Sequence, residues 1–77
     1  MIPAQCRAAR ALLNVTQPGL ASAASLSLTT VVDYELARRV VSAEAVAAMR
    51  AALETAGVEF IAENGEGPGV RLRKATK

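Results

Sequence analysis

The chain contains no histidine, only one cysteine and only two aromatic residues. Because Cys6 stands alone and histidine is absent, the sequence supplies neither an intramolecular disulfide nor a Cys/His metal site. A single thiol on the apolar side of a helix usually fills the core and has no reactive role. We therefore expect no metal and no cofactor, in a chain that suits a reducing compartment.

Long apolar runs and catalytic groups are also missing. No stretch approaches 18 uninterrupted apolar residues, and the start Met1-Ile2-Pro3 lacks the features of a signal peptide. The glycine-rich segment 64–69 has no lysine and reads as a turn, and no acids are brought together as a catalytic pair. These absences predict a soluble, cytoplasmic protein that is not an enzyme and has no membrane partner.

What the chain does have is a small aliphatic core. Its 77 residues are 52% hydrophobic, and with so few aromatics the core must consist of closely packed Ala, Val, Leu and Ile. This composition favours helices in a single domain. A domain of this length has an unfolding free energy on the order of 5 kcal/mol. Contacts with a partner or a second copy would add to that value.

Caps and apolar spacing predict four helices. Pro3 suits a first turn and Thr16, Ser27 and Ser42 suit N-caps, so we expect helices over 3–13, 17–24, 28–36 and 43–56, the last ending at Gly57. The core positions expected from helical spacing are Cys6, Ala9, Leu12, Leu13, Leu20, Ala21, Ala24, Val31, Tyr34, Val46, Met49, Leu53 and Ala56.

The segments 58–62 and 70–73 alternate apolar and polar residues on either side of the glycine-rich turn, which predicts a β-hairpin. We expect one domain with a helical part, residues 1–57, and a hairpin with a basic tail, residues 58–77. Strand 70–73 also offers an edge at which a homodimer could pair, a point that the sequence leaves open.

The most informative segment is 16–35. It resembles the helix-turn-helix motif of the Xre or lambda-repressor-like family, which reads Ser/Thr-Gln-x-x-Leu-Ala-x-x-Ala-Gly-Val-Ser-x-x-Thr-Ile-x-x-x-Glu. The residues in register are Thr16, Gln17, Leu20, Ala21, Ala24, Ser27, Thr30 and Glu35. The phrase 57–60 is similar to small alphaproteobacterial members. The resemblance implies a mainly α, four-helix lambda-repressor-like domain, with Glu35 in a structural role, paired with an arginine such as Arg10.

In such domains the second helix of the motif lies in the major groove of DNA. The resemblance implies that Gln17 and Ser27 contact the DNA backbone and that Leu28, Thr29, Val32 and Asp33 face bases. Thr30 is a further reading residue, and Arg38 and Arg39 are placed to meet phosphates. The chain departs from the family pattern at the turn positions Ser25, Ala37 and Val41, where glycine, glycine and proline are common.

A second departure bears on function. Leu28, Val32 and Leu36 form an i, i+4, i+8 stripe where DNA readers carry polar or basic residues, and residues 15–37 contain two acids but no Lys or Arg. DNA affinity rests chiefly on Lys and Arg, so this segment is poorly suited to DNA. The stripe indicates either a protein-binding face or burial under the C-terminal hairpin.

The first of two functional predictions is a protein-binding module. Leu28, Thr29, Val32 and Leu36 would then dock on another transcription regulator and block it, and the chain looks similar to the antiactivators of rhizobial quorum-sensing and mobile-element circuits. The alternative is a DNA-binding transcriptional regulator. Its residues would be Gln17, Ser27, Thr29, Thr30, Asp33, Arg38 and Arg39.

Overall fold

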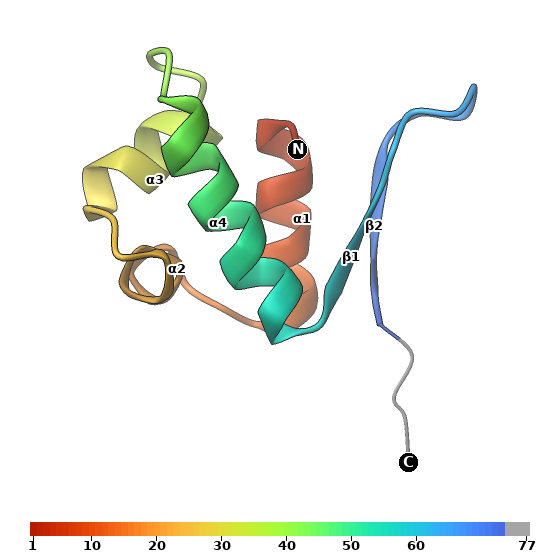
Figure 1. The fold of residues 1–77 in the computed structure, drawn as a ribbon, viewed down its shortest axis with the longest axis horizontal. Helices are drawn as coiled ribbons and strands as arrows, with labels where there is room; N and C mark the ends of the chain where they lie inside the picture. The colour runs from red at the N-terminus through yellow and green to blue at the C-terminus, as the bar shows by residue number, and fades with distance from the viewer. Residues whose placement is uncertain (74–77) are drawn as a thin grey trace.

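The structure is a computed structural model that describes residues 1–73 of the chain. Its elements are α1 (Pro3–Leu13), α2 (Gln17–Ala24), α3 (Leu28–Glu35), α4 (Ala43–Ala56), β1 (Val58–Ile61) and β2 (Gly69–Leu72), as Figure 1 shows. The mainly helical class with a small antiparallel hairpin is thus confirmed. Lys74 and Lys77, the lysines of the expected basic tail, lie outside the described residues.

The predicted serine and threonine caps begin three of the four helices. The hydroxyl of Thr16 accepts a hydrogen bond from the Gly19 amide at 3.0 Å, and Ser27 and Ser42 make the equivalent bonds at 3.2 and 3.1 Å. Each bond satisfies one of the amides that a helix start leaves without a partner. The three helix starts therefore follow directly from local sequence.

The helix ends explain the departures at glycine positions. Ser25 ends α2 with φ 57° and Ala37 follows α3 with φ 54°, which is the left-handed region that glycine occupies without strain. Asn14 ends α1 in the same region, and Gly57 ends α4 at φ 120° as predicted. Helix α3 stops at Glu35, one residue before the expected end, because Leu36 has left the helical conformation.

The core lies between the four helices and the first strand. Its buried apolar residues are Cys6, Ala9, Leu20, Ala21, Val31, Tyr34, Met49, Leu53 and Val58. Leu13, Ala24 and Val46 pack against it and are partly buried. Two expected core residues are exposed. Leu12 is 43% exposed because the buried side of α1 runs through Gln5, Cys6 and Ala9, and Ala56 stands at the end of α4, beyond its last core contact at Leu53.

The hairpin pairs Val58 with Leu72 and Ile61 with Gly69. Strand β1 ends one residue earlier than expected, and β2 is displaced by one residue toward the N-terminus. It packs against α1 and α4, while α3 lies on the opposite side of these helices (Figure 1). The buried Gln5 amide fastens it by donating to the carbonyls of Gly69 at 2.9 Å and Ile61 at 3.3 Å. The hairpin therefore does not cover the α3 stripe.

Candidate functional site

The position of α3 is fixed by a buried carboxylate at its last residue. Glu35 is 1% exposed and accepts two hydrogen bonds from the Arg10 guanidinium, both at 2.7 Å. The amide of Gln17 donates to it at 3.0 Å and the thiol of Cys6 at 3.2 Å, while Arg7 donates to its backbone carbonyl. The predicted pairing of Glu35 with Arg10 is confirmed, and it ties α3 to α1 and α2.

The network also sets the ionisation of its members. Burial acts to raise the pKa of Glu35, but the hydrogen bonds from Arg10, Gln17 and Cys6 outweigh it and hold that pKa below its usual value. Burial raises the pKa of the Cys6 thiol to about 12, with a contribution from its hydrogen bond to Glu35. At neutral pH the carboxylate is therefore charged and the thiol is not.

The outer side of α3 leaves large apolar side chains in contact with solvent. Leu28 is 45% exposed at the first residue of the helix and Leu36 is 55% exposed just after its end, while Val32 between them is half-buried. Thr29 is exposed beside Leu28, and Val40 in the following loop is 94% exposed. We call Leu28, Thr29, Val32, Leu36 and Val40 the α3 surface. Val31 and Tyr34 occupy the inner side of the helix, so the core does not cover this row.

Val40 is a member that the sequence prediction missed. It stands in the connection between the third and fourth helices, where no periodic pattern assigns a residue to a face. The one available signal is the presence of an apolar residue in a connecting segment next to two arginines. That signal acquires meaning only once the structure places the connection after the exposed end of α3.

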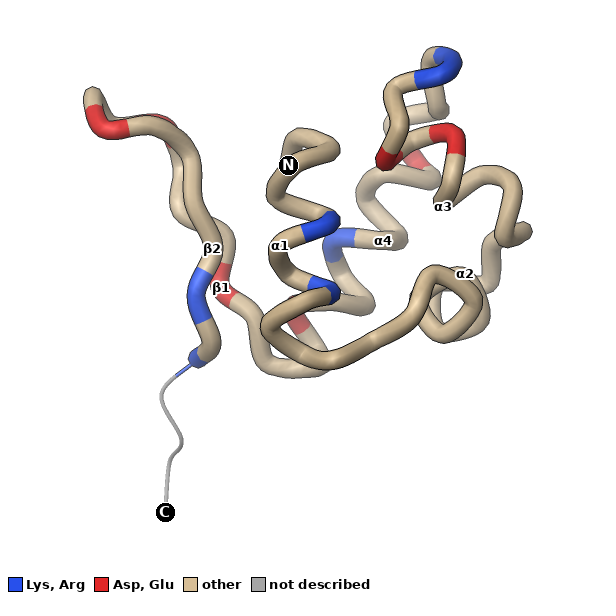
Figure 2. Tube along the Cα trace, turned by 180° about the vertical axis from the view of Figure 1, so that it is seen from behind, with Lys and Arg blue, Asp and Glu red and all other residues tan. Residues whose placement is uncertain are grey.

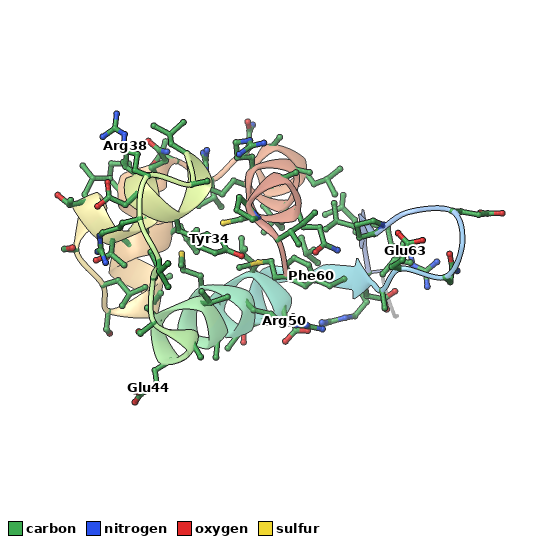
Figure 3. All side chains as sticks on the ribbon, turned by 90° about the horizontal axis from the view of Figure 1, so that it is seen from above. Tyr34, Arg38, Glu44, Arg50, Phe60 and Glu63 are labelled. Carbon is green, nitrogen blue, oxygen red and sulfur yellow. The ribbon has the colours of Figure 1, made fainter. Side chains whose placement is uncertain are left out.

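The charges near the α3 surface largely cancel. Asp33 forms an ion pair with Arg39 at 2.8 Å and a longer one with Arg38 at 3.9 Å. Figure 2 shows α2 without charge and the two arginines in the loop beyond α3, and Figure 3 shows Arg38 pointing away from the domain. Two cations and one anion therefore border an apolar row, and α2 and the first turn of α3 contribute no charge.

Across residues 1–73 the seven arginines equal the seven acidic residues in number, because the net charge of +2 resides on Lys74 and Lys77. Five of these arginines form ion pairs with carboxylates, and the other two donate to backbone carbonyls. The described part of the chain is thus electrically balanced. It lacks the excess of positive charge that drives binding to a phosphate backbone.

Most side chains predicted for DNA contact already have hydrogen-bond or ion-pair partners within the protein. The side chain of Gln17 is half-buried and bonded to Glu35, while the hydroxyls of Ser27 and Thr30 bond to each other at 2.8 Å. Of the hydroxyl residues in this set, Thr29 is exposed, and its hydroxyl makes no side-chain hydrogen bond within residues 1–73. The residues predicted for protein binding therefore lie on the outer side of α3, whereas the predicted DNA contacts other than Thr29 have partners within the protein.

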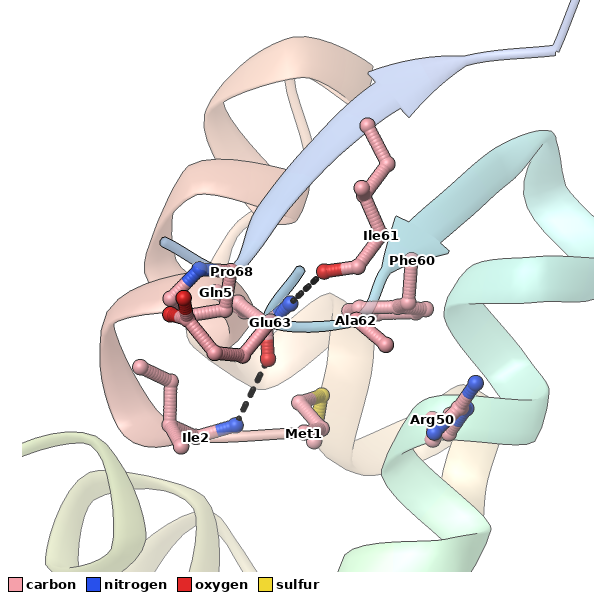
Figure 4. A pocket seen from close by; sticks show the side chains of 9 residues that line it. All are labelled: Met1, Ile2, Gln5, Arg50, Phe60, Ile61, Ala62, Glu63 and Pro68. Carbon is pink, nitrogen blue, oxygen red and sulfur yellow. Dashed lines mark hydrogen bonds between the residues drawn. The ribbon is translucent and has the colours of Figure 1, made fainter. Parts of the chain in front are cut away.

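A separate pocket lies on the far side of the domain, between the N-terminus, α4 and the hairpin (Figure 4). It is lined by Met1, Ile2, Gln5, Arg50, Phe60, Ile61, Ala62, Glu63 and Pro68. Its polar groups already have partners. Gln5 holds the hairpin, Arg50 pairs with Glu54 and lies 5.1 Å from the Phe60 ring, and Glu63 accepts from loop amides. This arrangement is structural and points to no bound ligand.

No protein-family model matches this chain, and no curated protein matches it either. Within residues 1–73, no group of three or more Cys, Asp or Glu side chains is placed to hold a metal ion. None of the helices in this described part has the length and apolar character needed to cross a membrane. The candidate site therefore rests on the geometry of the α3 surface itself.

Proposed function

We propose that this chain is a helix-turn-helix protein of the Xre or lambda-repressor-like kind that acts in the cytoplasm by binding another transcription regulator. The α3 surface is its contact face, and blocking of the bound regulator makes the chain an antiactivator. The observation that carries this proposal is the exposure of Leu28, Leu36 and Val40, which is 45% or more for each although α3 is anchored on its inner side.

Apolar side chains held in water on a rigid helix favour association. Covering fully exposed Leu side chains stabilises a complex by about 1.5–3 kcal/mol each, so half-exposed Leu28 and Leu36 contribute roughly 1 kcal/mol each. The bonds of Glu35 to α1 and α2 hold the row in place before any partner binds, which reduces the entropic cost of binding. The face thus suits a helix-in-groove contact with a folded partner.

The alternative function, operator binding by the same helix, has one observation in its favour. Arg38 and Arg39 have side chains that are 62% and 50% exposed, and both stand at the end of α3 where phosphates would lie. Both also pair with Asp33, and residues 15–37 contain no Lys or Arg. We therefore rank this function second.

The test compares Leu28→Ser/Leu36→Ser with the matched control Leu12→Ser, which changes an equally exposed leucine on α1. Tagged wild-type protein is used to capture a regulator, which is identified, purified and titrated against all three proteins. We expect the double variant alone to lose affinity while keeping its melting temperature. Equal binding by folded double variant and wild type would exclude the α3 surface as the contact.

A DNA mobility-shift assay on the region upstream of the gene, repeated at several salt concentrations, tests the alternative. The proposed function predicts only weak binding that does not depend on DNA sequence. Tight, sequence-specific binding that weakens in Arg38→Gln/Arg39→Gln would establish the DNA function instead.

A further inference from the structure

The outer edge of β2 carries backbone groups without partners. The Arg73 amide donates to the Gly57 carbonyl at 2.6 Å, so these two residues form a hydrogen-bonded pair. Hydrogen-bonded and non-hydrogen-bonded pairs alternate along an antiparallel ladder, so every second pair from this one is hydrogen-bonded. Val70 and Leu72 fall in the pairs between them, so their amides and carbonyls point away from β1. Within residues 1–73, no group outside the two strands bonds to the amide or carbonyl of either residue. This edge is free to pair with another extended strand.

The two edges of the hairpin have different surroundings. Beside β1, the Arg50 side chain of α4 lies over the Phe60 ring and pairs with Glu54, so charged side chains border this edge and oppose strand addition there. Beside β2, a shallow groove runs between the strand and α1, lined by Ile2, Ala4, Gln5, Ala8, Pro68, Gly69 and Val70. None of these residues is charged. The β2 edge is thus open, and an apolar shelf accompanies it.

Exposed leucine and isoleucine side chains continue this shelf. Ile2 is 45% exposed, and Leu12 and Leu72 are 43% and 50% exposed. Leu12 follows Ala8 by one helical turn on α1, which runs alongside β2 (Figure 2). Together with the α3 surface, these three residues account for all six exposed large hydrophobic residues of the described chain.

We propose that the occupant of the β2 edge is β2 of a second copy of this chain, paired antiparallel about a two-fold axis. The two hairpins then form one four-stranded sheet. The added strand has the same outward amides and carbonyls, so each edge satisfies the other, as a two-fold interface requires. Its Val70 and Leu72 side chains lie on the inner side of the sheet and cover the partner's α1 shelf.

Charge favours the same occupant. The shelf has no charged residue, residues 1–73 carry no net charge, and Arg71 on the outer side of the sheet is already paired with Glu59 at 2.8 Å. Two copies therefore approach without strong like-charge repulsion. The α3 surface lies across the domain from the hairpin, so the dimer leaves both copies of that surface free. This inference does not depend on the proposed function.

The test is the oligomeric state of the full chain by light scattering and analytical ultracentrifugation. We expect a particle of twice the 8.0 kDa chain mass near millimolar concentration that dissociates on dilution. Val70→Pro removes one outward amide and leaves the internal ladder intact, because proline is tolerated where the amide faces solvent. It is expected to be monomeric, as is Leu12→Glu, whereas the control Leu36→Ser on α3 stays dimeric.

Amide exchange in the wild-type protein gives a second measurement that needs no variant to fold. The Val70 and Leu72 amides are expected to exchange about tenfold more slowly at high protein concentration than at low. The Arg71 amide, which is bonded within the hairpin, exchanges slowly at both. A monomer at all concentrations, or Val70 and Leu72 exchange that does not depend on concentration, overturns the proposal. A dimer that Leu36→Ser disrupts and Leu12→Glu does not would place the interface on α3 instead.

Discussion

Replacing Ala37 by glycine is expected to stabilise this protein, although glycine usually weakens a fold. Ala37 has φ 54°, a conformation that costs an L-residue about 1–2 kcal/mol. Glycine removes that cost but gives up about 0.5–1 kcal/mol of chain entropy. Ala37 is exposed, so the change loses no packing. The expected net gain is about 0.5–1 kcal/mol, which raises the melting temperature of a domain this small by roughly 2–8 °C.

Two further left-handed positions turn this single change into an ordered series. Ser25 at φ 57° is expected to gain less than Ala37 when replaced by glycine, since serine is a common residue of turns. Asn14 at φ 61° is expected to change least because asparagine tolerates this region. Ala47→Gly, an exposed position inside α4, is the control and is expected to destabilise by about 1 kcal/mol.

The assay is thermal and urea unfolding followed by circular dichroism. The slope of unfolding free energy against urea concentration is expected to be the same in all variants of the series. If Ala37→Gly destabilised the protein as much as Ala47→Gly does, the left-handed strain at the end of α3 would not exist. The connection that carries Val40 would then follow a different path, and Val40 would not belong to the α3 surface.

Three further predictions concern the buried network around Glu35. Arg10→Met removes both guanidinium bonds to the Glu35 carboxylate, which is 1% exposed. Leaving a buried charge without its partner costs about 3–5 kcal/mol, so the urea midpoint of this variant is expected to fall close to zero. The pKa of Glu35 is lowered on folding, so its contribution to stability is complete above its unfolded pKa of about 4.3 and is lost as pH falls through the folded value. In Glu35→Gln the unfolding free energy is therefore expected to fall less steeply with decreasing pH in that acid range. A wild-type slope of unfolding free energy against pH in this variant would contradict the prediction. Cys6 is fully buried with its pKa raised to about 12, and we expect a thiol reagent at mildly alkaline pH to label it only as fast as the domain opens, a rate that urea below the midpoint increases.

Much of the fold could be predicted because its signals are local. Ser27 and Ser42 mark helix starts by a bond to the amide three residues on, and Gly57 marks an end by a conformation that glycine adopts freely. The failures at Leu12 and Ala56 are of another kind. Whether a helical position at core spacing is covered depends on which neighbour reaches it, and α1 buries a narrower stripe than its apolar residues indicate.

The candidate site was predictable only in part, for the same reason. The spacing of Leu28, Val32 and Leu36 places them on one face of a helix, but their exposure depends on where the hairpin packs. The sequence permitted the hairpin to cover α3, whereas Gln5 fastens it to α1. These two bonds join residues more than 50 positions apart, and no local sequence pattern predicts them. The Arg10–Glu35 pairing, by contrast, came from the family resemblance.

The measurement that tests the central claim most directly is calorimetric titration of the captured regulator with wild-type protein and with Leu28→Ser/Leu36→Ser. Half-exposed leucines contribute roughly 1 kcal/mol each, so loss of both is expected to weaken binding about 30-fold. The heat-capacity change of binding is also expected to become less negative, since less apolar surface is buried. Wild-type affinity in a folded double variant, with Leu12→Ser binding equally well, would contradict the account.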